Sequence, residues 1–168
     1  MKKVILGLGS NRNYNGLTSL EILSEACDSL SEILSFITLS SVYISKPMYY
    51  ENQDDFYNMA LSGFLDDEME PEVLLEKIQA IEKEFGRNRE KEIRNGPRSL
   101  DIDIEYIEGI SLNTEKLKIP HPKIKERAFV LVPVLEILDK TADEKLMEEF
   151  SFYLKNLPDS KNLVKICL

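Results

Sequence analysis

Residues 100–106 alternate between apolar and acidic side chains, and this pattern constrains the fold more than any other stretch of the sequence. The apolar members are Leu100, Ile102, Ile104 and Tyr106, and the acidic members are Asp101, Asp103 and Glu105. A period of two predicts a β-strand with one buried face. The fold must therefore place a layer of apolar side chains against one side of this strand, with the acidic side chains on the other.

Asp101 and Asp103 are two residues apart in this strand, so their side chains point the same way, with α-carbons roughly 6.5–7 Å apart. Two carboxylates at that separation can share a hard cation such as Mg²⁺, or hold two of them. The alternative is that all three acidic residues form the solvated face of an amphipathic strand. We interpret Glu105 in that second way, as an exposed residue and not a metal ligand.

A short basic stretch lies directly before the strand, in residues 86–98. It holds five Lys and Arg residues against two Glu, in a chain whose net charge is −9, and it ends with Gly96-Pro97-Arg98. Guanidinium groups suit phosphate oxygens, and paired carboxylates suit Mg²⁺. A carboxylate pair beside an arginine-rich loop therefore indicates a polyphosphate site more strongly than a solvated face, which needs no cluster of opposite charge beside it.

Composition limits the other possibilities. A length of 168 residues predicts one domain, spanning residues 1–168. The net charge of −9 argues against binding to nucleic acid or a membrane surface, which relies on basic patches. The longest later apolar run, Ala128–Leu135, contains Pro133 and is far shorter than a membrane span. Cys27 and Cys167 do not indicate a disulfide framework. We expect a cytoplasmic monomer.

The hydrophobic periodicity predicts the secondary structure. The expected core elements are strand 4–8, helix 17–34, strand 37–44 with a possible bulge at Ser40-Ser41, strand 56–64, helix 71–85 and strand 100–106. Weak strands around 111–112 and 117–119 and helices over 128–138 and 143–155 follow. The core order β-α-β-β-α-β predicts an α+β, ferredoxin-like antiparallel sheet with helices on one face and C-terminal helical additions. This fold alone names no function.

The common nucleotide-binding signatures are missing. The chain has no G-x-x-x-x-G-K-[ST] motif, and Gly7-Leu8-Gly9 lacks the third glycine of G-x-G-x-x-G. We interpret these two glycines as a strand end and a tight turn. No Ser-His-Asp arrangement can be read from the sequence. A nucleotide would therefore be held through metal and side chains, which phosphoryl transfer tolerates because it relies on positioning and charge stabilisation.

Several segments together carry a resemblance to a known family. They are Leu6-Gly7-Leu8-Gly9-Ser10-Asn11, Asp55-Phe56-Tyr57-Asn58, Gln79-x-x-Glu82, Gly86-Arg87-x-Arg89, Gly96-Pro97-Arg98-Ser99-Leu100-Asp101-Ile102-Asp103, Ile119-Pro120-His121 and Arg127-Ala128-Phe129. Occurring in one order, they resemble the 6-hydroxymethyl-7,8-dihydropterin pyrophosphokinase family of folate biosynthesis. The resemblance implies transfer of pyrophosphate from ATP to the hydroxymethyl group of the pterin, with release of AMP.

The resemblance also implies roles for individual residues. Asp101 and Asp103 would hold two Mg²⁺ ions, and the catalytic set would be Arg87, Arg98, Asp101 and Asp103. The ATP side would comprise Gln79, Glu82, Arg89, Arg98, the backbone near Ile104, Lys116, His121 and Arg127. The pterin side would comprise Phe56 and Phe129 as a ring clamp, Asn58 at the polar edge, and Ser45, Lys46 and Met48. Without the resemblance, Gln79 and Glu82 are expected on the solvent-exposed side of their helix.

The sequence departs from the family pattern at a few positions. Asn95 stands where a tryptophan is common, Pro122 where a tyrosine is frequent, and Lys118 where a threonine is frequent. Lys116 stands at a frequent arginine, and Glu105 where an apolar residue is usual. None of these departures touches the Asp pair or Arg98.

Two other functions fit the same residues. A ferredoxin-like regulatory module would bind a small anionic metabolite without chemistry and without need of Mg²⁺. A Mg²⁺-dependent nucleotide hydrolase would use the same carboxylate pair but would need no pterin. The products formed from ATP with and without the pterin distinguish all three.

Overall fold

The computed structural model describes residues 1–48, 50–88, 93, 96–158 and 162–166. Arg89, Asn95 and Cys167, which the sequence analysis names, lie outside this part of the chain. The elements in chain order are β1 Lys2–Ser10, α1 Ser19–Ser31, β2 Ser35–Leu39, β3 Val42–Ser45, β4 Phe56–Leu65, α2 Pro71–Glu84, β5 Asp101–Ile107, β6 Leu112–Asn113, β7 Lys118–Ile119, a 3-10 turn Ile124–Glu126, α3 Ala128–Ile137, α4 Glu144–Lys155 and β8 Val164–Ile166.

The central sheet is antiparallel and has the predicted ferredoxin-like arrangement. Its strand order is β5-β1-β4-β3-β8, and β2 also pairs with β4. The expected strand over residues 37–44 is two strands, because the chain breaks at Ser40 and Ser41, where the alternation of side chains fails. No sequence pattern predicted β8, which has three residues and pairs with β3 at the sheet edge. The predicted fold class is confirmed.

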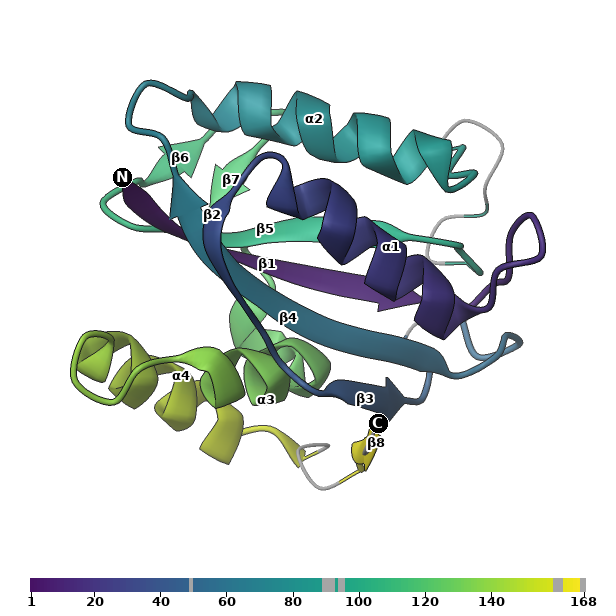
Figure 1. Cartoon of the computed structure of the whole chain (residues 1–168). Helices are drawn as coiled ribbons and strands as arrows, with labels where there is room; N and C mark the ends of the chain where they lie inside the picture. Colours follow the sequence, from purple (N-terminus) through teal and green to yellow (C-terminus); the bar gives the residue numbers. More distant parts are fainter. Residues whose placement is uncertain (49, 89–92, 94–95, 159–161, 167–168) are drawn as a thin grey trace.

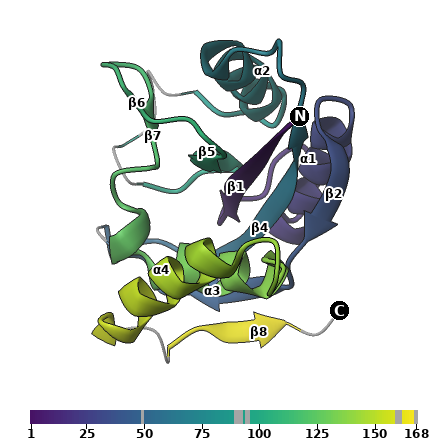
Figure 2. The same cartoon turned by 90° about the vertical axis from the view of Figure 1, so that its left-hand side faces the viewer.

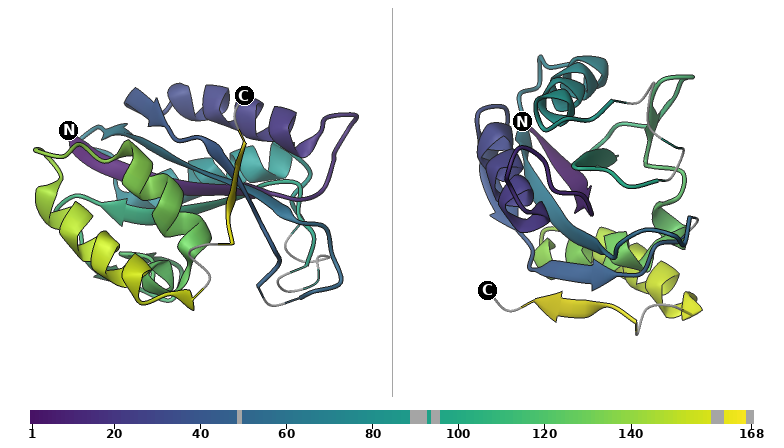
Figure 3. Two further views of the ribbon diagram at one scale, coloured as in Figure 1. Left: turned by 90° about the horizontal axis from the view of Figure 1, so that it is seen from below. Right: turned by 90° about the vertical axis from the view of Figure 1, so that its right-hand side faces the viewer.

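Helices cover both faces of the sheet (Figures 1 and 3). The helices α1 and α2 pack on one face, and the C-terminal additions α3 and α4 pack on the other, while the β6–β7 hairpin stands beside β5 (Figure 2). In the described part of the chain, no helix combines the length and the apolar character that crossing a membrane requires.

Local sequence explains why these layers form. A capping box between Thr18 and Glu21 starts α1, and Leu23, Cys27 and Leu30 form its buried stripe. Alternate residues of β1 then enter two different clusters. Val4, Leu6 and Leu8 pack under α1 and α2, whereas Ile5 packs toward α3.

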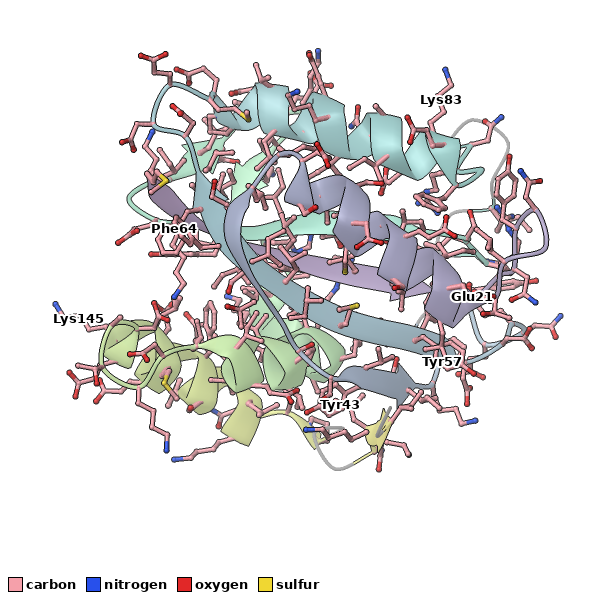
Figure 4. The ribbon with its side chains drawn as sticks, viewed as in Figure 1. Glu21, Tyr43, Tyr57, Phe64, Lys83 and Lys145 are labelled. Atoms are coloured by element: carbon pink, nitrogen blue, oxygen red, sulfur yellow. The ribbon has the colours of Figure 1, made fainter. Side chains whose placement is uncertain are left out.

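Glu136 of α3 joins the second helical layer to the sheet edge. Its carboxylate accepts hydrogen bonds from the Ser41 amide (3.0 Å), the Ser41 hydroxyl (2.8 Å), the Tyr43 hydroxyl (3.0 Å) and Lys165 Nζ of β8 (2.9 Å). Tyr43 is labelled in Figure 4, on the side of the sheet that faces α3. Burial raises the pKa of Glu136, but these hydrogen bonds outweigh it and lower the pKa to about 2.

Because the folded pKa of Glu136 lies below its usual 4.5, the stability it contributes is present above pH 4.5 and is lost as the pH falls toward 2. We expect Glu136→Gln to lower the free energy of unfolding by about 1–2 kcal/mol at pH 7. The difference from the unsubstituted protein should shrink by pH 3. Urea unfolding at both pH values measures it, with the exposed Glu148→Gln as the control. A difference of the same size at both pH values would contradict the assignment.

Candidate active site

One cavity on the α3 side of the sheet collects most of the residues that the sequence singled out. Its volume is about 710 Å³, including the part open to solvent. Its lining comprises Gly7, Leu8 and Gly9 of β1, Ser45, Lys46, Met48 and Gln53 around β3 and the following loop, Phe56, Asn58 and Met59 of β4, Arg98, Asp101, Asp103 and Glu105 at β5, and Arg127, Phe129 and Val130 at α3.

Gly7 and Gly9 form the floor of this cavity. Both lie inside β1 and pair with neighbours on both sides, so the interpretation as a strand end and tight turn is wrong. A Cβ on Gly9 would lie 3.3 Å from Asn58 Oδ1, and one on Gly7 would lie 3.0 Å from Glu105 Oε1. Glycine fits here without displacing a neighbour, because the side chains of Asn58 and Glu105 approach β1 closely.

Asp101 and Asp103 both face the cavity and are bound by arginines. Asp101 accepts a hydrogen bond from Arg98 Nη1 at 2.7 Å, and Arg87 Nη2 lies 3.3 Å from its other oxygen. Asp103 accepts from Arg127 Nη1 at 3.1 Å. The structure thus brings the acidic pair together with Arg87 and Arg98 of the basic stretch, and with Arg127, which only the resemblance had indicated.

Burial and mutual repulsion act on the acidic pair. Burial raises the pKa of Asp103, the negative charge of Asp101 raises it further, and His121 and Arg127 act in the opposite direction. The described residues contain no cluster of three or more His, Cys, Asp or Glu side chains that could hold a metal. Two carboxylates nevertheless fit Mg²⁺, which typically takes one or two protein carboxylates and completes its shell with phosphate oxygens and water.

Asn11, to which the sequence assigned no individual role, joins two segments whose residues line the cavity. Its Nδ2 donates to Gln53 Oε1 (3.0 Å) and to the Asp54 carbonyl (2.9 Å), and its Oδ1 accepts from the Arg98 amide at 2.9 Å. Asn11 is 5% exposed. It therefore ties the loop that carries Gln53 to the segment that carries Arg98. The asparagine directly after Gly9-Ser10 was the available signal, but its partners lie far away in the sequence.

Glu82 occupies a different place from the one expected. It is 1% exposed, and its Oε1 accepts a hydrogen bond from the Ile102 amide at 2.9 Å. The expectation of an exposed Glu82 is wrong because β5 is an edge strand of the main sheet, and its outward amide needs an acceptor. Gln79 is exposed on α2, and neither residue is among those lining the cavity.

The residues assigned to the pterin side all line the cavity. The guanidinium of Arg98 lies 5.5 Å from the Phe56 ring centroid, and that of Arg127 lies 5.7 Å from the Phe129 ring centroid. Asn58 is buried and donates from Nδ2 to Ser45 Oγ at 2.8 Å. Two aromatic rings and an ordered amide therefore border the same space as the acidic pair.

Three further residues assigned to the nucleotide side are not among those that line the cavity. The first is His121, whose Nδ1 lies 3.8 Å from Glu105 Oε2, and burial lowers the pKa of the ring although Asp103 opposes this. Ile104 is a core residue on the opposite face of β5, so only its backbone could serve a ligand. Lys116 is exposed between β6 and β7 and is not among the cavity-lining residues.

Glu105 contradicts the prediction of an exposed residue, since it is 0% exposed. The pairing of β1 with β5 shifts between Ile5, which pairs with Tyr106, and Leu6, which pairs with Ile104. Glu105 is the extra residue of this β-bulge. Its side chain reaches into the space over Gly7, and burial, followed by the charge of Asp103, raises its pKa well above the usual value.

An acidic pair, guanidinium groups and an aromatic pair around one cavity are the groups that a site for a polyphosphate and a flat ring would need. Comparison with known proteins specifies the class further. Residues 5–139 match the family model described as 7,8-dihydro-6-hydroxymethylpterin-pyrophosphokinase, HPPK. The chain belongs to this family.

Curated relatives agree with the family match. The chain is 38% identical over 137 residues to the 2-amino-4-hydroxy-6-hydroxymethyldihydropteridine pyrophosphokinase of Aquifex aeolicus, covering 82% of this chain and 81% of that protein. It is 41% identical over 111 residues to the protein of the same name from Bacillus subtilis, and the match covers 66% of this chain and 64% of that protein. It is 38% identical to the folic acid synthesis protein FOL1 of Dictyostelium discoideum over 97% of this chain, but spans only 24% of that longer protein.

Solved structures show the same fold. The HPPK-DHPS of Plasmodium falciparum with SDX-DHP superposes with a TM-score of 0.64 at 16% identity, covering 100% of this chain and 48% of the other. The A437G form with STZ-DHP gives a TM-score of 0.65, again at 16% identity, and the match covers 99% of this chain and 49% of the other. At this identity the likeness concerns the fold alone.

Proposed function

We propose that this protein transfers pyrophosphate from ATP to the hydroxymethyl group of 6-hydroxymethyl-7,8-dihydropterin and releases AMP, as a step of folate synthesis. Its family and the names of its curated relatives support this activity. The observation that carries the proposal is a single cavity lined both by Asp101 and Asp103 and by Phe56, Asn58 and Phe129.

The pterin would lie between Phe56 and Phe129. Two aromatic faces offer contact area to a flat heterocycle. The amide of Asn58 would offer Oδ1 as an acceptor to its polar edge, because Nδ2 already donates within the protein. Ser45 Oγ accepts from Asn58 Nδ2 and so fixes the orientation of that amide. An ordered amide discriminates between ring edges better than a mobile one.

The triphosphate would lie over β5, between the arginines. Arg98 and Arg127 already line the cavity, and their planar guanidinium groups suit phosphate oxygens. Both groups also lie beside an aromatic ring of the pterin side. The same two residues would therefore hold the phosphates at the edge of the pterin pocket, which is the juxtaposition that the transfer requires.

Asp101 and Asp103 would hold Mg²⁺, for which we propose two ions. Bound Mg²⁺ would neutralise phosphate charge and polarise the attacking hydroxyl. In the transfer, the pterin hydroxyl oxygen would bond to the β-phosphorus of ATP, the bond from the β-phosphorus to the oxygen of AMP would break, and the hydroxyl proton would pass to water. Arg98 and Arg127 would stabilise the charge that develops on the transferred group.

The test is to incubate the protein with ATP, Mg²⁺ and hydroxymethyldihydropterin and to identify the products by ³¹P NMR and chromatography. We expect AMP and the pterin pyrophosphate in equal amounts, and AMP only when the pterin is present. AMP or ADP without pterin would instead identify a nucleotide hydrolase. Binding of anions without turnover would identify a regulatory module.

A further inference from the structure

Glu136 is not among the residues that line the cavity, and the proposed reaction gives it no role. Its carboxylate nevertheless accepts four hydrogen bonds, from Ser41, Tyr43 and Lys165. These donors belong to the edge of the sheet, whereas Glu136 lies in the last turn of α3. Hydrogen bonds to a charged group are among the stronger ones, and four of them from different directions hold the carboxylate in one place. They therefore fix α3 against β3 at this point.

The donor Tyr43 belongs to a row of paired residues that crosses the floor of the cavity. Tyr43 pairs with Asn58 of β4, and the row continues to Gly9 of β1 and Asp101 of β5. Residues directly opposite each other in antiparallel strands share a face of the sheet, and for this row it is the face that α3 covers. Glu136 therefore binds the β3 end of the row that contains the amide proposed to read the pterin.

The helix α3 carries Phe129 in its first turn and Glu136 in its last. Seven residues make about two helical turns, so the two side chains lie on the same face of α3, about 10 Å apart along its axis. Phe129 lines the cavity, where it would cover one face of the pterin. Since α3 cannot slide along β3 or move away from it without breaking the hydrogen bonds of Glu136, these bonds also restrain Phe129.

We infer that Glu136 is a positioning residue for the pterin pocket. Its hydrogen bonds with Ser41 and Tyr43 fix the distance between α3 and β3, and thereby the place of Phe129 relative to Asn58. The part of this inference that concerns the pterin rests on the proposed function. Glu136 is not assigned a contact with the pterin, the nucleotide or a metal ion.

Two substitutions of Glu136 separate this role from a simple loss of charge. Glu136→Leu removes all four hydrogen bonds. Glu136→Gln loses the ion pair with Lys165, but its Oε1 can still accept from the Ser41 amide and the Tyr43 hydroxyl, so the link between α3 and β3 remains. Glu148→Leu, at an exposed position of α4, is the matched control.

Calorimetric titration with 6-hydroxymethylpterin and, separately, with a nonhydrolysable ATP analogue and Mg²⁺ measures the effect on each ligand. We expect Glu136→Leu to raise the Kd of the pterin about fivefold and to leave the Kd of the analogue within about twofold. Glu136→Gln and Glu148→Leu should keep both values near those of the unsubstituted protein. The aromatic ¹H–¹³C signals of Phe129 in the ligand-free protein, assigned with Phe129→Leu, should shift only in Glu136→Leu.

A residue with only a structural role would lower Tm on substitution but leave the pterin Kd and the Phe129 signals unaltered, and this result would overturn the inference. Equal losses of affinity for both ligands would also overturn it, because they would indicate general damage. A failure of the proposed function has a different signature, since the unsubstituted protein would then bind no 6-hydroxymethylpterin. In that case the Phe129 signals of Glu136→Leu alone decide whether Glu136 positions the ring.

Discussion

Replacing Asp101 or Asp103 by asparagine is expected to reduce kcat/KM by about three orders of magnitude or more. Asparagine keeps the size of the side chain but removes the negative charge and one of the two oxygens that could bind Mg²⁺. Both carboxylates face one cavity with three guanidinium groups close by, so losing either one would weaken the proposed metal binding and leave the positive charge of the arginines uncompensated. Steady-state turnover and titration with Mn²⁺ measure the two effects.

The same substitutions should leave stability within about 1 kcal/mol of the unsubstituted protein. Each removes an ion pair with an arginine but also relieves repulsion, since the charge of Asp101 is one of the causes that raise the pKa of Asp103. Urea unfolding checks this, and Asp28→Asn on the exposed face of α1 is the control. Near-normal turnover in both folded variants would refute the metal assignment.

Much of the fold could be predicted from the sequence because its signals are local. The spacing of Leu23, Cys27 and Leu30 places α1, and the alternation over residues 100–106 places β5. The short strand β8 escaped prediction because three residues show no usable period, and it exists through pairing with β3. The division into β2 and β3 was visible at Ser40 and Ser41 only as a break in alternation.

The residues of the candidate site also differ in whether a local pattern in the sequence predicts their position. Asp101 and Asp103 could be predicted because a period of two fixes their common direction. The direction of Glu105 was also correct, but its burial depends on residues at 121–130 that cover this face of the sheet, and no local pattern reports that. Glu82 and Asn11 depend on partners 20 and 87 residues away, namely Ile102 and Arg98.

Asn58→Leu is expected to reduce kcat/KM for the pterin by about two to four orders of magnitude. Leucine has the same number and branching of side-chain heavy atoms as asparagine but can neither donate nor accept a hydrogen bond, so the polar edge of the heterocycle would be desolvated without compensation. Binding of an ATP analogue alone should change little, because the phosphates would lie over β5 and not beside β4. Calorimetric titration with each ligand separates the two effects.

The substitution also removes the hydrogen bond from Asn58 Nδ2 to Ser45 Oγ, and the lost bond should destabilise the protein by about 1 kcal/mol. Ser62→Ala is the matched control, since Ser62 is a buried polar residue of the same strand that is not among the cavity-lining residues. Equal losses of pterin and nucleotide affinity in Asn58→Leu would point to general damage of the site. A loss confined to the pterin would place the heterocycle against β4, because only that ligand would miss the amide.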